Sequence, residues 1–251
     1  LKTHMNRRQF ITKSSGLLLS FPMLTQAQNQ KRGKRLGLSI ASYRRGSRFY
    51  SEEFPAWKNA LDVLDHCKSL KAGCLQIGVR GWTRDFAGKV RERRENLDIR
   101  LEGQISLPRK DSDIDRFDET VRMAKEAGAT VLRTVCLGGR RYETFKKLED
   151  WQHFRTQSWE SLVRAEKIVR QHGVKLAFEN HKDWRSHEQL DLLHRLSSES
   201  VGVCFDFGNN VSLLEDPHVQ VEALAPFIMT THLKDMRAQA CEDGFLLSEV
   251  P

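Results

Sequence analysis

The chain has 251 residues, of which 39% are hydrophobic and 29% are charged, and it carries a formal net charge of +8. This composition excludes fibrous proteins and membrane bundles, and the length suits one large domain. Residues 1–35 hold eight Lys and Arg and no acid, whereas the other 33 bases are balanced by 33 acids. The basic charge therefore belongs to the leader, which argues against nucleic acid as a partner of the folded body.

The leader resembles an export signal. A twin-arginine pair, Arg7-Arg8, is followed by an uncharged stretch over 14–24 and by the small-x-small pattern Thr25-Gln26-Ala27. We expect residues 1–27 to be a Tat-type signal peptide and residues 28–35 to be a basic linker. The Tat export machinery is then a partner, and the destination is periplasmic or extracellular. The apolar run is too short for a stable membrane span, which needs about 20 residues.

Beyond the leader, short apolar runs alternate with stretches of helical periodicity. A strand is predicted over 36–42, a helix over 57–67, a strand over 74–79, a helix over 84–95 and a strand over 99–107. There follow a helix over 114–124, a strand over 130–136, a helix over 159–169 and a strand over 174–178. The last predicted elements are a helix over 190–196, a strand over 201–205, a helix over 219–225 and a strand over 227–233.

This alternation predicts a parallel sheet, and its length favours one barrel domain. Seven strand–helix units in one run, without a G-x-G-x-x-G motif after the first strand, indicate a (β/α)8 TIM barrel over 36–251. The eighth strand and helix are missing, so we expect the chain to be truncated after Pro251. Gly73, Gly128 and Gly173 each precede a strand and are expected to end helices in the left-handed conformation. The five cysteines form no CxxC pair and are expected to be mostly buried free thiols.

Three chemically active side chains follow consecutive predicted strands. Glu179, Asp206 and His232 each come after an apolar run and are each about one βα unit apart. In a TIM barrel, the carboxyl ends of the strands carry the active site. A carboxylate, a carboxylate and an imidazole suit Mn²⁺, Mg²⁺, Co²⁺ or Zn²⁺. Spacing alone leaves open both a metal site and three ordinary ion-paired or solvated residues.

The strings FEN (178–180), CFDFGN (204–209) and THLKD (231–235) carry a family resemblance. In this order and spacing they resemble the sugar phosphate isomerase/epimerase superfamily, the xylose isomerase-like TIM barrels. The resemblance implies that Glu179, Asp206 and His232 are the first three ligands of a divalent metal. A fourth ligand, a Glu, would then lie on a strand after Pro251. The implied reaction moves a proton next to a carbonyl through an enediolate, with Glu179 as both ligand and acid/base.

Five further residues are candidates for binding a small carbohydrate substrate. His181, Lys234 and Arg237 lie just beyond the ligand positions, and Asn209 stands where many relatives have a substrate-contacting His. Trp82 follows the second strand and could stack on a sugar ring, although a core aromatic is an equal reading. A surface salt bridge is the simpler reading of Lys234.

Three other functions remain open on the same barrel. The first is a metal-dependent dehydratase or lyase acting on a keto-sugar or keto-inositol. The second is an apurinic endonuclease of the family-2 type, which needs extra histidines, including one at the position of Asn209. The third is a non-catalytic sugar-binding barrel. Because phosphorylated sugars are scarce outside the cytoplasm, export favours a free sugar or keto-sugar as the substrate of an isomerase or epimerase.

Overall fold

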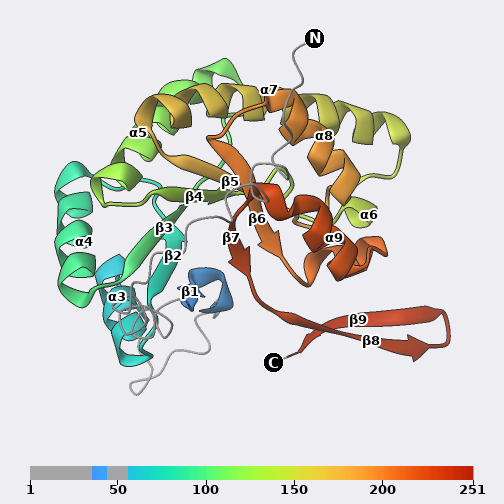
Figure 1. The fold of residues 1–251 in the computed structure, drawn as a ribbon, viewed down its shortest axis with the longest axis horizontal. Helices are drawn as coiled ribbons and strands as arrows, with labels where there is room; N and C mark the ends of the chain where they lie inside the picture. Colours follow the sequence, from blue (N-terminus) through green and yellow to red (C-terminus); the bar gives the residue numbers. More distant parts are fainter. Residues whose placement is uncertain (1–35, 44–55, 251) are drawn as a thin grey trace, which may run out of the picture.

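A computed structural model describes residues 36–43 and 56–250 and shows a curled parallel sheet of seven strands (Figure 1). The strands run in chain order across the sheet: β1 Gly37–Ser39, β2 Cys74–Gly78, β3 Arg100–Gln104, β4 Val131–Thr134, β5 Lys175–Glu179, β6 Val201–Asp206 and β7 Ile228–His232. The predicted α/β class and TIM-barrel-like fold are confirmed as an open half-barrel. No eighth parallel strand joins this sheet within the described ranges.

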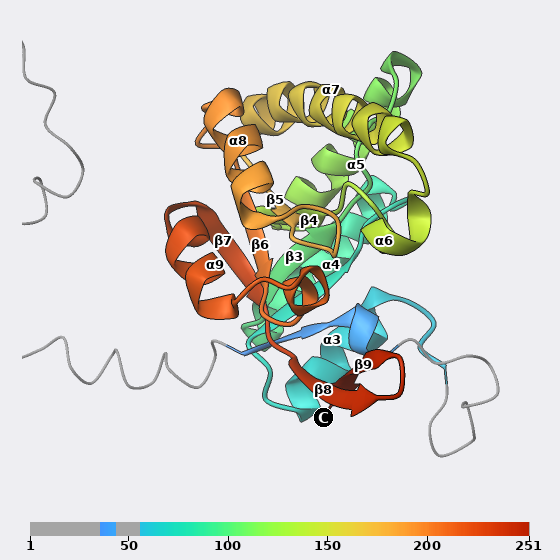
Figure 2. The same cartoon turned by 90° about the vertical axis from the view of Figure 1, so that its right-hand side faces the viewer.

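The helices cover the convex outer face of the sheet (Figures 1 and 2). They are α3 Ala60–Ser69, α4 Arg84–Leu97, α5 Ile114–Glu126, α6 Arg141–Thr144, α7 Leu148–His172, α8 Ser186–Leu196 and α9 Pro217–Leu224. Two differences from the predicted pattern are clear. The long helix α7 begins eleven residues earlier than the apolar periodicity indicates, and α6 has too few residues to show a period.

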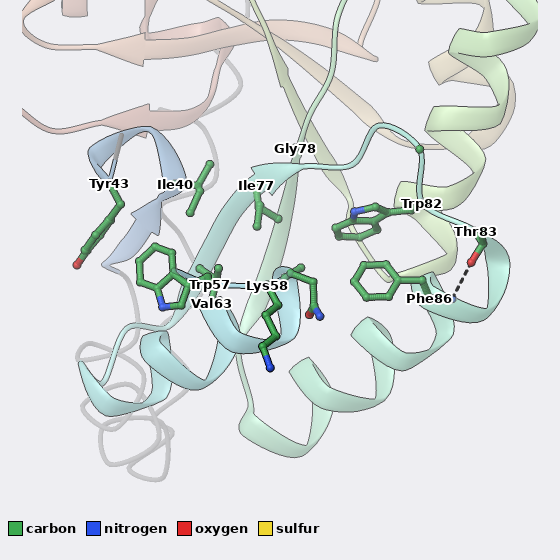
Figure 3. Close-up of a pocket in the computed structure, with 13 residues that line it drawn as sticks. Ile40, Tyr43, Trp57, Lys58, Val63, Ile77, Gly78, Trp82, Thr83 and Phe86 are labelled. Atoms are coloured by element: carbon green, nitrogen blue, oxygen red, sulfur yellow. Dashed lines mark hydrogen bonds between the residues drawn. The ribbon is translucent and has the colours of Figure 1, made fainter. Parts of the chain in front are cut away.

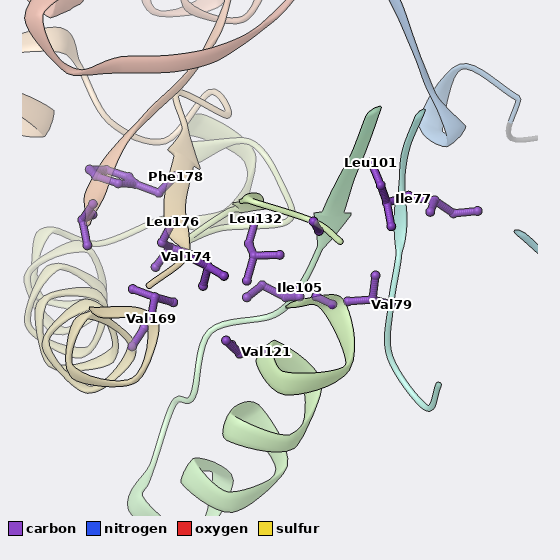
Figure 4. Packing of buried hydrophobic residues seen from close by; sticks show 14 of the residues in the cluster. Ile77, Val79, Leu101, Ile105, Val121, Leu132, Val169, Val174, Leu176 and Phe178 are labelled. Carbon is purple, nitrogen blue, oxygen red and sulfur yellow. The ribbon is translucent and has the colours of Figure 1, made fainter. Parts of the chain in front are cut away.

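The hydrophobic core lies between the sheet and these helices, because alternate strand residues point outward (Figure 4). Val121 of α5 and Val169 of α7 are fully buried against this face, as are Leu132 of β4 and Leu176 of β5. Burying such a side chain contributes about 1.5–3 kcal/mol. The inward-pointing residues of the same strands are thereby free to be polar.

Local signals explain where several elements begin and end. The side chain of Asn59 caps α3 and that of Asp216 caps α9. Gly173 ends α7 with φ 67°, and Gly128 follows α5 with φ 86°, as predicted. The prediction for Gly73 is wrong. The chain reverses after α3 at Lys71 instead, whose φ is 58°.

The two ends of the described chain differ most from the predicted pattern. The first strand stops at Ser39, and Ile40–Tyr43 forms a 3-10 helix. Beyond β7, the strands β8 Asp235–Cys241 and β9 Gly244–Val250 pair antiparallel with each other, outside the seven-stranded sheet. This hairpin extends beyond the carboxyl end of β7 (Figure 1). The two-residue turn Glu242-Asp243 joins the two strands, and Gly244, which begins β9, has φ 134°.

The cysteines behave largely as expected, and the leader lies outside the structure. All five are free; four of them are buried, and Cys241 of the hairpin is exposed. The predicted signal peptide and basic linker, residues 1–35, fall outside the described residues. None of the helices formed by residues 36–43 and 56–250 is both long and apolar enough to cross a membrane.

Candidate active site

The last residues of three neighbouring strands meet at the carboxyl edge of the sheet. Glu179 ends β5, Asp206 ends β6 and His232 ends β7. Parallel pairing brings them to one edge of the sheet: Asp206 is in register with His232, and Glu179 is in register with Cys204, two residues before Asp206. All three line one cavity of about 760 Å³ inside the curl of the sheet.

His232 lies between the two carboxylates. Its Nδ1 is 3.3 Å from Oε2 of Glu179 and 3.8 Å from Oδ2 of Asp206. Burial alone would lower the pKa of His232, but hydrogen bonds to Asp206, Cys204 and Glu179 raise it well above its usual value, to about 12. The ring is therefore cationic in the metal-free site. Its positive charge lies beside the two carboxylates whose negative charge a bound cation would otherwise balance.

The other ring nitrogen of His232 is held from β2. Nε2 lies 2.8 Å from Oε1 of Gln76, whose own Nε2 donates to Glu102 at 2.9 Å. Because a carboxylate only accepts, this bond orients the amide of Gln76 with its oxygen toward the ring. Nε2 of His232 must then carry a proton, which leaves Nδ1 as the nitrogen that can bind a metal.

Glu179 is almost fully buried and is bound on both oxygens. Nε of Arg133 donates to Oε2 at 2.5 Å, and Nδ2 of Asn209 donates to Oε1 at 2.9 Å. Burial alone would raise the pKa of Glu179, but the hydrogen bond from His232 and the charge of Arg133 lower it to about 2. Glu179 is therefore ionised over the physiological range, as a metal ligand must be.

Asp206 is held by the loop that follows it. Its Oδ1 accepts from the backbone N–H groups of Gly208 at 2.9 Å and Asn209 at 3.0 Å. The ammonium of Lys234 lies 3.3 Å from Oδ2 and donates to Oδ1 of Asn209 at 2.6 Å. The carboxylate is thus fixed in direction, with Oδ2 beside Lys234 and His232.

Three donor atoms lie close enough together to hold a divalent cation. One oxygen of Glu179, one nitrogen of His232 and the sulfur of Cys204 all lie within 4.8 Å of one another. Ligand atoms around one ion at 2.0–2.3 Å have separations of this order. Asp206 lies beside this group, 3.8 Å from His232. The residues present therefore fit a metal ion, and they include a thiol that the sequence analysis did not count among the donors.

The structure separates the predicted substrate-binding residues into two sets. His181, Asn209 and Lys234 line the cavity that holds Glu179. Arg237 is exposed on the β8–β9 hairpin and is not among the described residues that line this cavity. Trp82 lies in a separate hollow of about 660 Å³, packed edge-on against Phe86 at 5.3 Å (Figure 3). Residues of the 3-10 helix Ile40–Tyr43, of β2, α3 and α4 and of the neighbouring loops surround that hollow, and the three predicted ligands are not among them.

Some site residues escaped the sequence analysis. Arg133 pairs with Glu179, Gln76 binds His232, and Cys204 completes the compact donor group. A signal for them exists, because each is polar or sulfur-bearing and occupies an alternate position within an apolar strand. On a barrel strand such positions point inward. Glu102 of β3 receives hydrogen bonds from Gln76 and Thr230.

Comparison with known proteins identifies a family with this architecture. The family model described as "Xylose isomerase-like TIM barrel" matches residues 64–244, which include β2 to β7 and the three predicted ligands. The match covers well over half of the chain.

Two curated relatives match part of the chain. The uncharacterised protein YihM of Escherichia coli (strain K12) is 30% identical over 143 residues, which are 57% of this chain and 39% of that protein. The 3-oxo-isoapionate decarboxylase of Pectobacterium atrosepticum is 26% identical over 161 residues, which are 63% of this chain and 52% of that enzyme. The matched part thus spans about half or less of these relatives.

Solved structures share the fold at low identity. The probable 3-DHS dehydratase AsbF from Bacillus anthracis superposes with a TM-score of 0.61 at 14% identity, over 80% of this chain and 73% of that one. The 3-keto-D-glucoside 4-epimerase YcjR from E. coli gives 0.60 at 12% identity, over 80% and 78%. At such identities the likeness concerns the fold.

Proposed function

The chain belongs to the xylose isomerase-like TIM barrel family, and we propose that it is a divalent-metal-dependent sugar isomerase or epimerase. The reaction would move a proton next to a carbonyl group of a free sugar or keto-sugar. One observation carries the proposal: Glu179, Asp206 and His232, from three consecutive strands, meet in one cavity at the carboxyl edge of the sheet. Carboxylate and imidazole donors at that edge are what such chemistry requires.

The residues of the site have two roles, which are to bind a cation and to transfer a proton. Glu179, Asp206 and His232 would hold the metal. When bound, a divalent cation stabilises the negative charge that develops on the substrate oxygens as the proton leaves. Oε2 of Glu179 already contacts Arg133 and His232, so we assign proton transfer to Oε1, on the side of Asn209. Glu179 is 2% exposed, which limits the contact of its carboxylate with solvent.

The cavity suits a small polyhydroxylated molecule. Its volume of about 760 Å³ lies within the range of small-molecule sites. Asn209, His181 and Lys234 line it, and amide, imidazole and ammonium groups bind hydroxyl and carbonyl oxygens. We propose these three as the substrate-binding residues, with Trp82 and Arg237 as more distant candidates.

The test is exchange of the proton next to the carbonyl in deuterated water, followed by NMR on free keto-sugars with and without Mn²⁺. The wild-type chain is expected to exchange the proton only with metal, and Glu179→Gln to lose about 100-fold or more of the rate. Glu92→Gln, on the exposed face of α4, is the matched control and should exchange normally. Full exchange by Glu179→Gln would overturn the base role of Glu179.

A lyase is the second candidate, and the comparisons favour it specifically. One partly matching relative is called a decarboxylase, and one structure with the same fold is called a probable dehydratase. The same base could remove the same proton while a hydroxyl group or another β-substituent leaves. Product analysis decides between them, since an isomer or epimer keeps the molecular mass and a dehydration product loses one water. If neither product forms, the third candidate, a barrel that binds sugar without catalysing a reaction, is favoured.

We also propose that the protein is exported by the Tat machinery, from the Arg7-Arg8 pair and the apolar stretch after it. Export supports a substrate without phosphate. Cell fractionation tests this proposal, with Arg7→Lys/Arg8→Lys as the variant expected to stay in the cytoplasm. Activity confined to phosphorylated sugars would contradict the substrate class.

A further inference from the structure

We propose that Cys204 is a metal ligand, and that its thiolate gives the site a preference for thiophilic divalent cations such as Co²⁺ and Zn²⁺ over Mg²⁺ and Mn²⁺. This inference rests on the proposed metal-dependent function. It changes the donor set from oxygen and nitrogen alone to oxygen, nitrogen and sulfur.

The position of Cys204 on its strand supports a role as a ligand. Cys204 lies on β6 two residues before Asp206, and side chains two apart on a strand point to the same face. Its β5 partner in the register is Glu179, and its β7 partner is Thr230, two residues before His232. The thiol is therefore directed into the curl of the sheet, next to the ends of the two neighbouring strands.

The distances from the sulfur of Cys204 to the other donor atoms also support this role. Sγ of Cys204 belongs to the one group of possible ligand atoms, among the described residues, in which every pair lies within 4.8 Å. The other members are Glu179 and His232, so the group combines three donor types around one point. Asp206, at the outer side of His232, remains available as a fourth protein donor.

The chemistry of a thiolate ligand accounts for the proposed metal preference. Thiolate sulfur is a soft ligand that selects Zn²⁺ and related ions, whereas Mg²⁺ and Mn²⁺ prefer oxygen. Cys204 is completely buried, so a disulfide or a reaction with a bulky oxidant is not its role. Binding breaks the S–H bond and forms a sulfur–metal bond, and the proton leaves to solvent.

The chain offers a matched control. Cys74 of β2 is also a buried free thiol and lines the cavity that holds Glu179, yet it is outside the compact donor group. A variant at Cys74 therefore removes a thiol from the cavity without removing the proposed ligand.

The experiment is titration of the metal-free chain with Co²⁺ alone, followed by ultraviolet and visible absorption. The wild type and Cys74→Ala should both show a sulfur-to-cobalt charge-transfer band that saturates at one equivalent. Cys204→Ser and Cys204→Ala should lose the band and bind Co²⁺ at least about tenfold more weakly. Their affinity for Mn²⁺ should change less, so the ratio of the two affinities is the readout of preference.

The outcomes are separable. Co²⁺ binding by the wild type without a sulfur band overturns the role of Cys204 and leaves the proposed function standing. Absence of any Co²⁺ or Mn²⁺ binding overturns the proposed function and the inference together. The wild-type spectrum decides the role of sulfur even if a Cys204 variant fails to fold, and circular dichroism identifies such a variant.

Discussion

Gln76 and His232 are 156 residues apart in the chain, yet Oε1 of Gln76 lies 2.8 Å from Nε2 of His232 inside the curl of the sheet. The contact orients the imidazole so that Nδ1 faces Glu179. It belongs to a polar network that continues through Glu102 to Thr230. One buried amide thus decides which nitrogen of His232 can bind a cation.

We predict that Gln76→Leu lowers the affinity for Co²⁺ about 10- to 100-fold, because the ring loses the acceptor that fixes its orientation. Isothermal titration calorimetry measures the change. Gln104→Leu is the matched control, since Gln104 donates to the same oxygen of Gln76, while the hydrogen bond with the ring of His232 is made by Gln76 itself. Equal losses in both variants would show that the network is needed as a whole and that the contact with His232 has no special role.

Metal affinity should rise with pH. In the metal-free site, hydrogen bonds to Asp206, Cys204 and Glu179 raise the pKa of His232, so the ring carries a proton on Nδ1 that a cation must replace. Each proton released makes the apparent affinity rise about tenfold per pH unit. We expect at least this slope for Co²⁺ between pH 6 and pH 8, measured by competition with a chelator. An affinity independent of pH would contradict proton release from His232.

Asp183 should make stability depend on pH. It is fully buried after β5 and accepts from the backbone N–H groups of Leu137, His181 and Trp184, yet burial raises its pKa to about 7. The unfolded chain has a pKa near 3.9 for this group, so its contribution is present below about pH 4 and is lost as pH rises to about 7. The loss is about 1.4 kcal/mol per pH unit in that window.

Urea unfolding at several pH values measures this contribution. Asp183→Asn is expected to be less stable at pH 4, because its amide N–H₂ faces the N–H of Leu137, but to have a flatter pH profile between pH 4 and pH 7. Parallel profiles for the two proteins would show that Asp183 does not titrate in this range.

Glu215 should matter for stability more than its position in a loop suggests. Its carboxylate accepts from Ser186 at the start of α8, from Asn210 and from Gln220 of α9. Glu215→Ala would leave buried Asn210 and Gln220 without this partner, and we expect a loss of about 2–4 kcal/mol in the free energy of unfolding. Glu222→Ala, exposed on α9, should change it by less than about 0.5 kcal/mol. Similar losses in both variants would contradict the role of Glu215.

The placement of Glu179, Asp206 and His232 could be predicted from the sequence because parallel strands end at one edge. Each follows an apolar run, and the parallel order of β5, β6 and β7 brings the ends of these strands to one edge of the sheet. The fold class followed from the same alternation of strands and helices. These are local patterns combined with one rule of topology.

The partners of these residues could not be predicted in the same way. The contact Gln76–His232 joins β2 and β7, which are far apart in the strand order, and it depends on how strongly the sheet curls. The contact Arg133–Glu179 joins the neighbouring strands β4 and β5, and it depends on the register of their pairing. The β8–β9 hairpin was missed for a different reason, since its strands are mostly exposed and lack a buried apolar run. Gly244, directly after the turn and with φ 134°, was a local indication of it.

The most direct test of the account is the stoichiometry and affinity of divalent metal binding to the purified chain, measured for the wild type and for Glu179→Gln. The variant keeps the size of the side chain and removes the charge. We predict one Co²⁺ per wild-type chain and an affinity at least about 100-fold lower in Glu179→Gln, because a neutral amide is a far weaker ligand than a carboxylate. One ion bound equally well by both proteins would contradict a metal site centred on Glu179, Asp206 and His232.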